Sequence, residues 1–560
     1  MIKVSQKHIT LRDVGFIVFF SGLLYLPFLG GIHLFDWDEI NFAEMAREML
    51  MTKDYLRLHI NFQPFYEKPP LFIWMQALSM HLFGVNEYAA RFPNAVCGIV
   101  THLAIYFIGK ELFNRKLALV WTCIYAGTIL PHWYFKSGII DPWFNLFIFL
   151  GIYFLIRHYW HIQAMFITKK TSPYFYLIIA GVFTGLALLT KGPVAMIVTC
   201  LVLGVYWIYL RLKFYISPLA LLGYLLITLT TAGTWLFVEV YQNGWVFINQ
   251  FLIRNYELFT QPDAGHKGFV GYHLVVFLLG GFPACIFCLR AFGKMPNEQP
   301  HHRDFRVWMI VLFAVVMLLF SIVDTKIIHY SSLTYLPFTF LAAMVINNLL
   351  DKRLMMSRWM TVSLVIIGTI WATVVAILPW VGINASQIIP HIKDVFAQEN
   401  LKADVHWTGL ESLVGVFFII SILIALYLIA KDEILKGLVI LFGGTALTVQ
   451  LIMFFMLGNI EAYSQRAAIE FFESIKGEDC YVLNVGYKSY AQLFYFEKKK
   501  PTNEQSYDDQ WLINGKIDKK VYLITKINLI HKIIDQSTDA KELCRKNGFV
   551  VFLRRPRKVE

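Results

Sequence analysis

Carboxylates and lysines gather in the first long polar stretch of the chain, residues 36–91. Asp38 and Glu39 precede one segment of helical periodicity, and Glu67 and Lys68 precede a Pro-Pro pair that starts another. A lysine beside a helix N-terminus suits a phosphate, and a carboxylate there suits a general base or a metal. A solvated loop whose acids only cap helices explains the same spacing, so these residue types alone leave both interpretations open.

Two amphipathic helices are expected to position these side chains. Asp38 is a candidate N-cap of the first helix, with Asn41, Glu44 and Glu48 on its polar side, and Gly84 is a candidate end of the second. The apolar stripes at helical spacing are Phe42, Met45, Ala46, Met49 and Leu50 in the first helix, and Leu71, Trp74, Met75, Leu78 and Leu82 in the second. The first helix should therefore rest on a membrane surface or on another helix, with Asp38 and Glu39 at its N-terminal end.

The composition is that of an integral membrane protein. Of 560 residues, 57% are hydrophobic and only 16% are charged, and the chain holds 48 Phe, 28 Tyr and 15 Trp. This balance excludes a soluble enzyme of several domains. The net charge of +12 is explained by basic loops on the cytoplasmic side and does not require nucleic acid as a partner.

Thirteen membrane spans are predicted, which makes the chain an α-helical polytopic protein. They are 14–35, 92–109, 117–135, 143–160, 174–190, 192–210, 218–239, 272–291, 306–323, 330–349, 359–379, 411–430 and 437–457. With the N-terminus inside, nearly every short inner loop is basic, from Lys110 and Arg115 to Lys431 and Lys436. This orientation places residues 36–91 in the first outer loop.

One topology then brings scattered ionisable residues to the outer face. They are Asp38, Glu39, Glu67, Lys68, Asp141, Lys191, Arg254, His266 and Lys326. Each has an ordinary explanation by itself: a lysine at a span end snorkels to the interface, and a lone loop histidine is usually solvated. Ionisable groups near membrane depth are costly, however, and their convergence on one face predicts a site there.

Residues 461–560 differ in character and are predicted to form a small α/β domain on the outer side, after a membrane domain of residues 1–460. CYVLNVG, KVYLIT and FVVFLRR are predicted strands, and Ser464–Ile475, Leu529–Ile534 and Ala540–Lys546 are helix-like. Cys480 and Cys544 are a candidate disulfide in an oxidising compartment, with the pairing left open. No nucleotide-binding fingerprint occurs, so no nucleotide is expected as a cofactor.

The ordered motifs resemble a known family. Asp-Glu after the first span, FYEKPP, LLTKGP, a histidine-containing loop before GYHL, and the TKxxHYS pattern are similar to those of the ArnT-type glycosyltransferases. These are aminoarabinose transferases of the GT-C superfamily, related to protein O-mannosyltransferases. The resemblance covers nearly the whole chain and implies about thirteen spans, interfacial helices in the first outer loop and a soluble C-terminal domain.

The resemblance also implies roles for individual residues. The expected catalytic residues are Asp38, Asp141 and Glu39; Lys68, Lys191, Arg254, Lys326, Tyr330 and Tyr66 are expected to bind substrate, and Glu67 and His266 are expected to bind a zinc ion. The choice of base between Asp38 and Asp141 is open. Asn41 stands where the family tends to have an arginine, and Phe65 lacks the hydroxyl expected at its position.

The function implied is an inverting transfer of a sugar from a polyprenyl (undecaprenyl) phosphate carrier to an acceptor on the periplasmic face of the bacterial inner membrane. The expected sugar is 4-amino-4-deoxy-L-arabinose or a similar one, and the expected acceptor is lipid A or another envelope component. The protein is expected to be a monomer among membrane lipids. Two alternatives are an O-mannosyltransferase-like enzyme acting on Ser or Thr, and a polyprenyl-lipid transporter. A transporter needs polar groups through both leaflets, whereas the motif residues here lie on one side.

Overall fold

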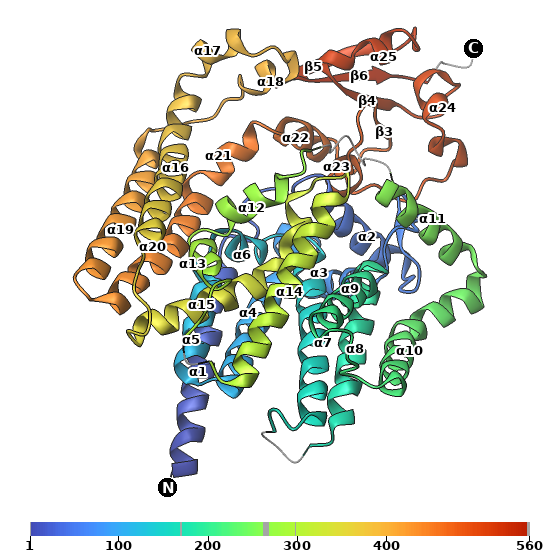
Figure 1. The fold of residues 1–560 in the computed structure, drawn as a ribbon. Coiled ribbons are helices and arrows are strands. Elements are labelled where there is room, and N and C mark those ends of the chain that lie inside the picture. Colours follow the sequence, from blue (N-terminus) through green and yellow to red (C-terminus); the bar gives the residue numbers. More distant parts are fainter. Residues whose placement is uncertain (1, 168–170, 261–267, 297, 557–560) are drawn as a thin grey trace.

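The computed structural model describes residues 2–167, 171–260, 268–296 and 298–556. Most of these residues are helical, and a small sheet near the C-terminus lies at one end of the helix bundle (Figure 1). The N-terminus of α1 lies at the opposite end (Figure 1). The predicted fold class, a polytopic helical protein with a small C-terminal α/β part, is confirmed.

The bundle is built from helices of very different lengths. They are α1 (Ile2–Tyr25), α4 (Glu87–Leu112), α5 (Arg115–Ala126), α6 (Ile129–Tyr134), α7 (Asp141–Ile162), α8 (Pro173–Lys191), α9 (Val194–Tyr209), α10 (Pro218–Asn243), α12 (Tyr272–Gly280), α13 (Ala284–Arg290), α14 (Pro300–Ile322), α15 (Tyr335–Leu350), α16 (Arg358–Ile383), α19 (Leu413–Ala430) and α20 (Ile434–Phe455). The connecting elements are α2 (Asp38–Thr52), β1 (His59–Ile60), β2 (Gln63–Pro64), α3 (Leu71–Phe83), α11 (Val246–Thr260), η1 (Ile328–Thr334), α17 (Ala385–Ile388), η2 (Ile389–His391), α18 (Val395–Asn400) and η3 (Leu410–Ser412).

Each predicted span falls on helical structure, but not every one makes a long apolar helix. Within the described residues, eight helices are long and apolar enough to cross a membrane, or nine if α12 and α13 form one bent span. The remaining predicted spans lie on α1, α5 with α6, α7 and α9, which are shorter, broken or more polar. The first of them ends at Tyr25 rather than at residue 35. Thirteen crossings therefore stays a prediction.

Helix α2 is buried on both of its sides, which the predicted amphipathic pattern does not explain. The predicted polar residues Asn41, Glu44 and Glu48 are at most 5% exposed, like the apolar stripe opposite them. Arg47 donates to Glu44 at 2.7 Å and to the main-chain carbonyl of Lys498 at 2.9 Å. The polar side is thus covered by the C-terminal part of the chain rather than by water.

The predicted apolar stripe of helix α3 is only partly packed against protein. The helix follows the Pro-Pro pair and ends at Gly84, as expected, but Leu78 and Leu82 of the stripe are 61% and 65% exposed. Phe72 and Ile73 are buried instead. Apolar residues surround this helix, so its periodicity does not distinguish the packed face from the lipid-facing one.

The C-terminal part contains a four-stranded sheet in the order β3-β4-β6-β5. Its elements are α21 (Leu457–Ala462), α22 (Arg466–Ser474), β3 (Tyr481–Asn484), α23 (Ala491–Phe494), η4 (Glu504–Tyr507), α24 (Asp509–Asn514), β4 (Val521–Lys526), η5 (Ile527–Leu529), α25 (His531–Ile534), β5 (Lys541–Lys546) and β6 (Phe549–Arg554). Strands β3 and β4 are parallel, and the other neighbours are antiparallel. The main apolar core runs from the bundle through α2 and α3 into α22 and α23, so the division at residue 460 stays a prediction.

Two predictions for this part are wrong. Residues 541–546, predicted helical with Ala540, form the edge strand β5, whose residues are all exposed. An exposed, charged edge strand lacks the apolar alternation that marks a strand in the sequence. Cys480 and Cys544 are not bridged. Cys480 adjoins β3 and Cys544 lies in β5, three strand spacings apart or about 14 Å, whereas a disulfide needs Cα atoms within about 7 Å.

Candidate active site

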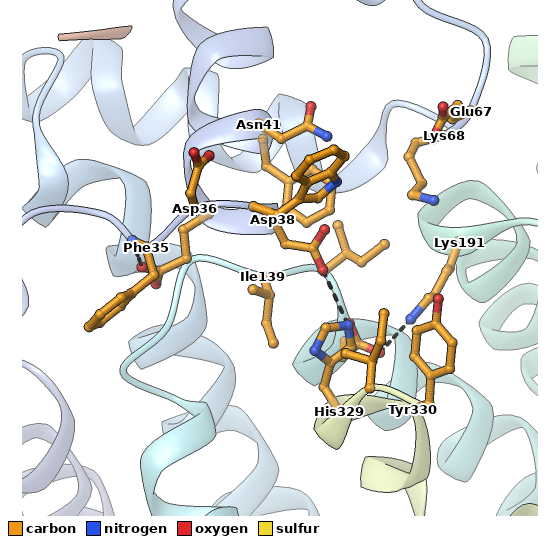
Figure 2. Close-up of a pocket in the computed structure, with 16 residues that line it drawn as sticks. Phe35, Asp36, Asp38, Asn41, Glu67, Lys68, Ile139, Lys191, His329 and Tyr330 are labelled. Atoms are coloured by element: carbon orange, nitrogen blue, oxygen red, sulfur yellow. Dashed lines mark hydrogen bonds and ion pairs between the residues drawn. The ribbon is translucent and has the colours of Figure 1, made fainter. Parts of the chain in front are cut away.

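Seven of the predicted site residues meet in a cavity of about 310 Å³ on the side of the bundle that carries the C-terminal sheet (Figure 2). Its lining comes from the segment before α2 and the first turn of α2, the turn before α3, the start of α7, the end of α8 and the start of η1. The lining side chains with chemistry are Asp36, Asp38, Glu39, Asn41, Glu67, Lys68, Asp141, Lys191, His329 and Tyr330. Segments nearly 300 residues apart in the sequence thus contribute to one site.

Two carboxylates face a shared histidine. His329 Nε2 lies 3.2 Å from Asp38 Oδ2 and 3.9 Å from Asp141 Oδ2 (Figure 2). Asp38 is the first residue of α2, not its cap, because Trp37 holds the cap position and Asp38 turns its carboxylate into the cavity. The sequence prediction of an N-cap at Asp38 is therefore wrong in detail. His329 is thus within hydrogen-bond distance of Asp38 and close to Asp141.

Lys191 neutralises Asp141. Its Nζ lies 2.6 Å from Asp141 Oδ1 and 5.1 Å from the ring centroid of Tyr330. Lys191 is the last residue of α8, and Gly192 lets the chain turn away directly after it with φ +85°. A Cβ on Gly192 would come within 2.4 Å of the Phe251 ring. The Gly-Pro break predicted after Lys191 is present, and it holds the ammonium at the cavity.

Lys68 is different, because its ammonium makes no hydrogen bond or ion pair with any described residue. Figure 2 shows its Nζ directed into the cavity, opposite the carboxylate of Asp38. Burial lowers the pKa of Lys68 below its ordinary value of 10.5, and the nearby Lys191 adds to that effect. A half-buried cation without a bound partner is a site ready for an anion.

Asp38 is held in its charged form. Burial alone would raise its pKa, but the hydrogen bond from His329 and the positive charges of His329, Lys68 and Lys191 outweigh that effect and lower the pKa below 3.8. A carboxylate that stays ionised is able to accept a proton from an acceptor group throughout the neutral range.

Glu39 also lines the cavity, yet its carboxylate is fully occupied. Arg91 donates to both oxygens, at 3.1 and 2.8 Å, and the backbone N–H groups of Gly138 and Phe35 donate at 2.5 and 2.9 Å. Arg91 also donates to the carbonyls of Leu29, Ile32 and His33. These bonds tie the chain on both sides of Asp38 to α4 and to the segment before α7, so Glu39 holds the position of the neighbouring aspartate.

Other predicted site residues lie around or away from the cavity. Arg254 of α11 donates from Nε to Glu67 Oε1 at 2.9 Å and does not line the cavity. Tyr66 packs on Phe247 in a separate apolar cluster. Lys326 donates to carbonyls at the C-terminal end of α14, including Ser321 at 2.8 Å. Neither Tyr66 nor Lys326 is part of the cavity lining.

The predicted metal ligands are not brought together by the described residues. His266 lies outside them, and within them no group of three His, Cys, Asp or Glu side chains is arranged to hold a metal ion. Glu67, the other predicted ligand, is paired with Arg254. The zinc ion therefore stays a prediction, and no step of the chemistry below depends on it.

Two groups of cavity residues were not predicted. His329 adjoins Tyr330 in the TKxxHYS motif, so its place between two predicted spans was the available signal. Asp36 and Trp37 form the other group, and they are held by the C-terminal part: Tyr490 donates to Asp36 at 3.4 Å, and Lys488 Nζ lies 4.4 Å from the Trp37 ring centroid. Such contacts across more than 450 residues leave no local pattern in the sequence.

This chain is similar to known proteins in sequence and in fold. Residues 67–237 match the family model described as dolichyl-phosphate-mannose-protein mannosyltransferase. The undecaprenyl phosphate-alpha-4-amino-4-deoxy-L-arabinose arabinosyl transferase of Pectobacterium carotovorum subsp. carotovorum (strain PC1) is 27% identical over 70% of this chain and 68% of its own length. The enzyme of that name from Photorhabdus laumondii is 24% identical over 56% of this chain and 55% of its own.

A solved structure shares the fold. The crystal structure of ArnT from Cupriavidus metallidurans bound to undecaprenyl phosphate superposes with a TM-score of 0.74 at 17% identity, covering 97% of this chain and 98% of that one. The apo structure of the same protein gives the same TM-score. The likeness extends through the bundle and the C-terminal sheet.

Proposed function

Since this chain is an ArnT-like integral membrane glycosyltransferase with the GT-C fold, we propose that it moves a sugar from a polyprenyl phosphate carrier to an acceptor at the outer face of the bacterial inner membrane. The ammonium of Lys68, which has no bonded partner among the described residues and faces the Asp38 carboxylate across the cavity, is the observation that carries this proposal. A cation for the phosphate and a carboxylate for the acceptor lie on opposite sides of one space.

The proposed donor is an undecaprenyl phosphate ester of 4-amino-4-deoxy-L-arabinose or a similar sugar, with lipid A or another envelope component as acceptor. The names of the relatives support the donor, and the apolar helices support entry of the carrier from the bilayer. The basic inner loops support a cytoplasmic N-terminus, which puts the cavity and the C-terminal sheet on the periplasmic side. We propose that the protein acts as a monomer.

In the proposed reaction, the donor phosphate lies against Lys68 and Lys191. An acceptor oxygen attacks the anomeric carbon, and the bond between that carbon and the phosphate oxygen breaks. The carrier phosphate leaves with the electron pair, and the two ammonium groups stabilise the charge that develops on it. Asp38 accepts the proton if the attacking group is a hydroxyl, and His329 holds its carboxylate in place.

Arg254 is proposed to act through Glu67, since it holds the turn that carries Lys68. Tyr330 is proposed to stack against the donor beside Lys191. Asp141, paired with Lys191 and near His329, is a second candidate for the base. A direct displacement of this kind inverts the anomeric configuration.

The test is transfer by the purified full-length protein in detergent, with a synthetic polyprenyl phosphate sugar and lipid A. We expect a glycosylated product of inverted configuration by mass spectrometry and NMR. Net retention would reject the single displacement, and uptake of the intact carrier into sealed vesicles without transfer would favour a transporter.

A second candidate is transfer to Ser or Thr of a protein, as in the mannosyltransferase family whose model matches residues 67–237. The two candidates share the donor side and differ in the acceptor. Offering lipid A and an unstructured Ser/Thr-rich peptide to the same preparation separates them, because only one of the two should gain the mass of the sugar.

A further inference from the structure

Helix α2 carries one buried polar side chain that lacks hydrogen bonds. Four of the five buried polar residues of this helix have bonded partners among the described residues. They are Glu39 with Arg91, Glu44 and Arg47 with each other, and Glu48 with the backbone N–H of Phe62. Asn41 is the fifth: it is only 5% exposed, and its Oδ1 accepts no hydrogen bond from any described residue. A buried amide in this state is costly unless a ligand or water supplies the missing bonds.

The position of Asn41 places this amide at the reaction site. It lines the same cavity as Asp38 and Lys68, and it is the one amide side chain among the described residues of that lining. Asp38 and Asn41 are three residues apart and therefore lie on the same face of α2. Figure 2 shows the Asn41 amide on the opposite side of Asp38 from His329, with its nitrogen on the side of Lys68. The amide is thus beside the carboxylate proposed as the base.

The unsatisfied atom decides which ligand group fits. Oδ1 of Asn41 is an acceptor, so its partner must donate a hydrogen bond. An ionised phosphate only accepts and does not match this oxygen. A hydroxyl both donates and accepts, and an amide both accepts and donates. Two adjacent hydroxyls on a sugar ring therefore match one amide, because one of them donates to Oδ1 while the other accepts from Nδ2.

The other polar groups of the cavity already have roles in the proposed reaction or bonded partners. Three carboxylates are paired with basic side chains: Glu39 with Arg91, Glu67 with Arg254 and Asp141 with Lys191. At about 310 Å³, the cavity is also near the lower end of the range of about 300–1,000 Å³ for small-molecule sites. That size favours a single sugar ring, with Asn41 as the neutral contact to it.

We propose that Asn41 binds two adjacent ring hydroxyls of the donor sugar and so helps to select which monosaccharide is transferred. The proposal rests on the proposed glycosyl transfer and deepens it, because it assigns the donor sugar a pair of neighbouring hydroxyls. Asp38 lies one helical turn away, where the acceptor oxygen attacks. The hydroxyls that Asn41 binds therefore belong to the ring whose anomeric carbon reacts, and Asn41 itself transfers no proton.

The test compares two synthetic donors with the purified full-length protein in detergent and lipid A as acceptor. One is undecaprenyl phosphate 4-amino-4-deoxy-L-arabinose, whose ring carries adjacent hydroxyls at C2 and C3, and the other is its analogue without the 3-hydroxyl. We expect Asn41→Ala to raise the KM for the first donor by about tenfold. The KM for the analogue should change by less than about twofold, because the analogue has already lost the same contact.

Further variants separate a sugar contact from a phosphate contact and from a folding defect. The Kd for undecaprenyl phosphate without a sugar should stay unchanged in Asn41→Ala, and a tenfold rise of that Kd would overturn the proposal. Asn41→Leu removes both polar atoms at a similar volume and should raise the KM for the complete donor as Asn41→Ala does. The Tm of neither variant should fall, since neither change breaks a side-chain bond to a described residue.

Asn347 of α15 provides a matched control. It is also a buried amide whose Oδ1 has no described partner, but it does not line the cavity. Asn347→Ala should leave both KM values unchanged.

The outcomes also separate this proposal from the proposed function. Equal KM values for the two donors in the unaltered protein would overturn the role of Asn41 while leaving the transfer intact. An unchanged KM for the complete donor in both Asn41 variants would do the same. Absence of transfer from either donor by the unaltered protein would instead count against the proposed function itself.

Discussion

Two buried charges of the first long loop, residues 36–91, have opposite surroundings. Around Glu39, every carboxylate oxygen is bonded, and Arg91 donates to five oxygens in all. Further along the same loop, Lys68 has no bonded partner among the described residues. The first arrangement fixes the backbone, and the second leaves charge available for a ligand. For Glu39 and Lys68, the difference lies in their partners and not in the presence of a charge.

The largest effect is expected from Asp38→Asn. This change removes the proposed base while leaving the size of the side chain, so the rate of transfer should fall by about 10²- to 10⁴-fold. The Kd for polyprenyl phosphate should stay within twofold or so, because Lys68 and Lys191 remain. Steady-state kinetics and a binding titration measure the two quantities. Unimpaired turnover would transfer the role of base to Asp141.

At the bonded Glu39–Arg91 pair, Arg91→Met should lower the thermal stability of the protein. It leaves the Glu39 carboxylate buried without its partner, which typically costs about 3–5 kcal/mol. Thermal unfolding in detergent should show a clear fall in Tm. The double variant Glu39→Met with Arg91→Met removes both charges and should recover part of it. A wild-type Tm for the single variant would contradict the structural role of this pair.

Lys68→Ala should weaken carrier binding without lowering stability, the opposite of the effect expected for Arg91→Met. The affinity for polyprenyl phosphate should fall about ten- to hundredfold, since a charged hydrogen bond is lost, and the Tm should not fall, because no bond to a described residue is broken. Lys68→Arg is the matched control and should bind more tightly than the alanine variant. If the alanine variant bound the carrier normally, Lys68 would have no phosphate role.

The same lysine should give carrier binding an alkaline limit. Its pKa lies below 10.5 in the free protein because the side chain is buried, so its charge is lost as the pH rises through that lowered value. The Kd for polyprenyl phosphate should therefore rise at alkaline pH. Lys68→Arg should move this limit upward, because a guanidinium keeps its proton. An identical pH profile for both proteins would assign the limit to another group.

The smallest effect is expected where both charges are exposed. Lys352 and Asp432 pair at the end of the bundle opposite the sheet, with side chains 68% and 64% exposed. Lys352→Ala should change stability by less than about 1 kcal/mol, and high salt should remove even that difference. A large loss of Tm would show that exposure is a poor guide to the value of an ion pair in this protein.

The composition of the sequence predicts the membrane spans. The charged residues at the ends of those spans predict the carboxylates and lysines of the cavity. Asp38, Lys68, Asp141 and Lys191 all meet in one cavity. The sequence does not predict which faces of α2 and α3 are buried. On α3, an exposed leucine is as stable against lipid as a packed one is against protein. On α2, the C-terminal part covers Glu44 and Glu48. Lys326 of the TKxxHYS motif was predicted to lie at the cavity, but His329 of the same motif lines it instead.

The contact between the first loop and the C-terminal part also constrains the path of the chain. Tyr495 accepts from the backbone N–H of Leu34 at 2.7 Å, so both regions lie on the same side of the membrane. The chain must then traverse the bilayer an even number of times between them. The bent pair α12–α13, with its 111° angle, contacts η1 through His273 and Ser331 at one end and the start of α14 through Ala291 and Arg306 at the other. The pair therefore spans the same depth as α14, as one full traverse would, and the total becomes even when α5 with α6, α7 and α9 are counted as traverses as well.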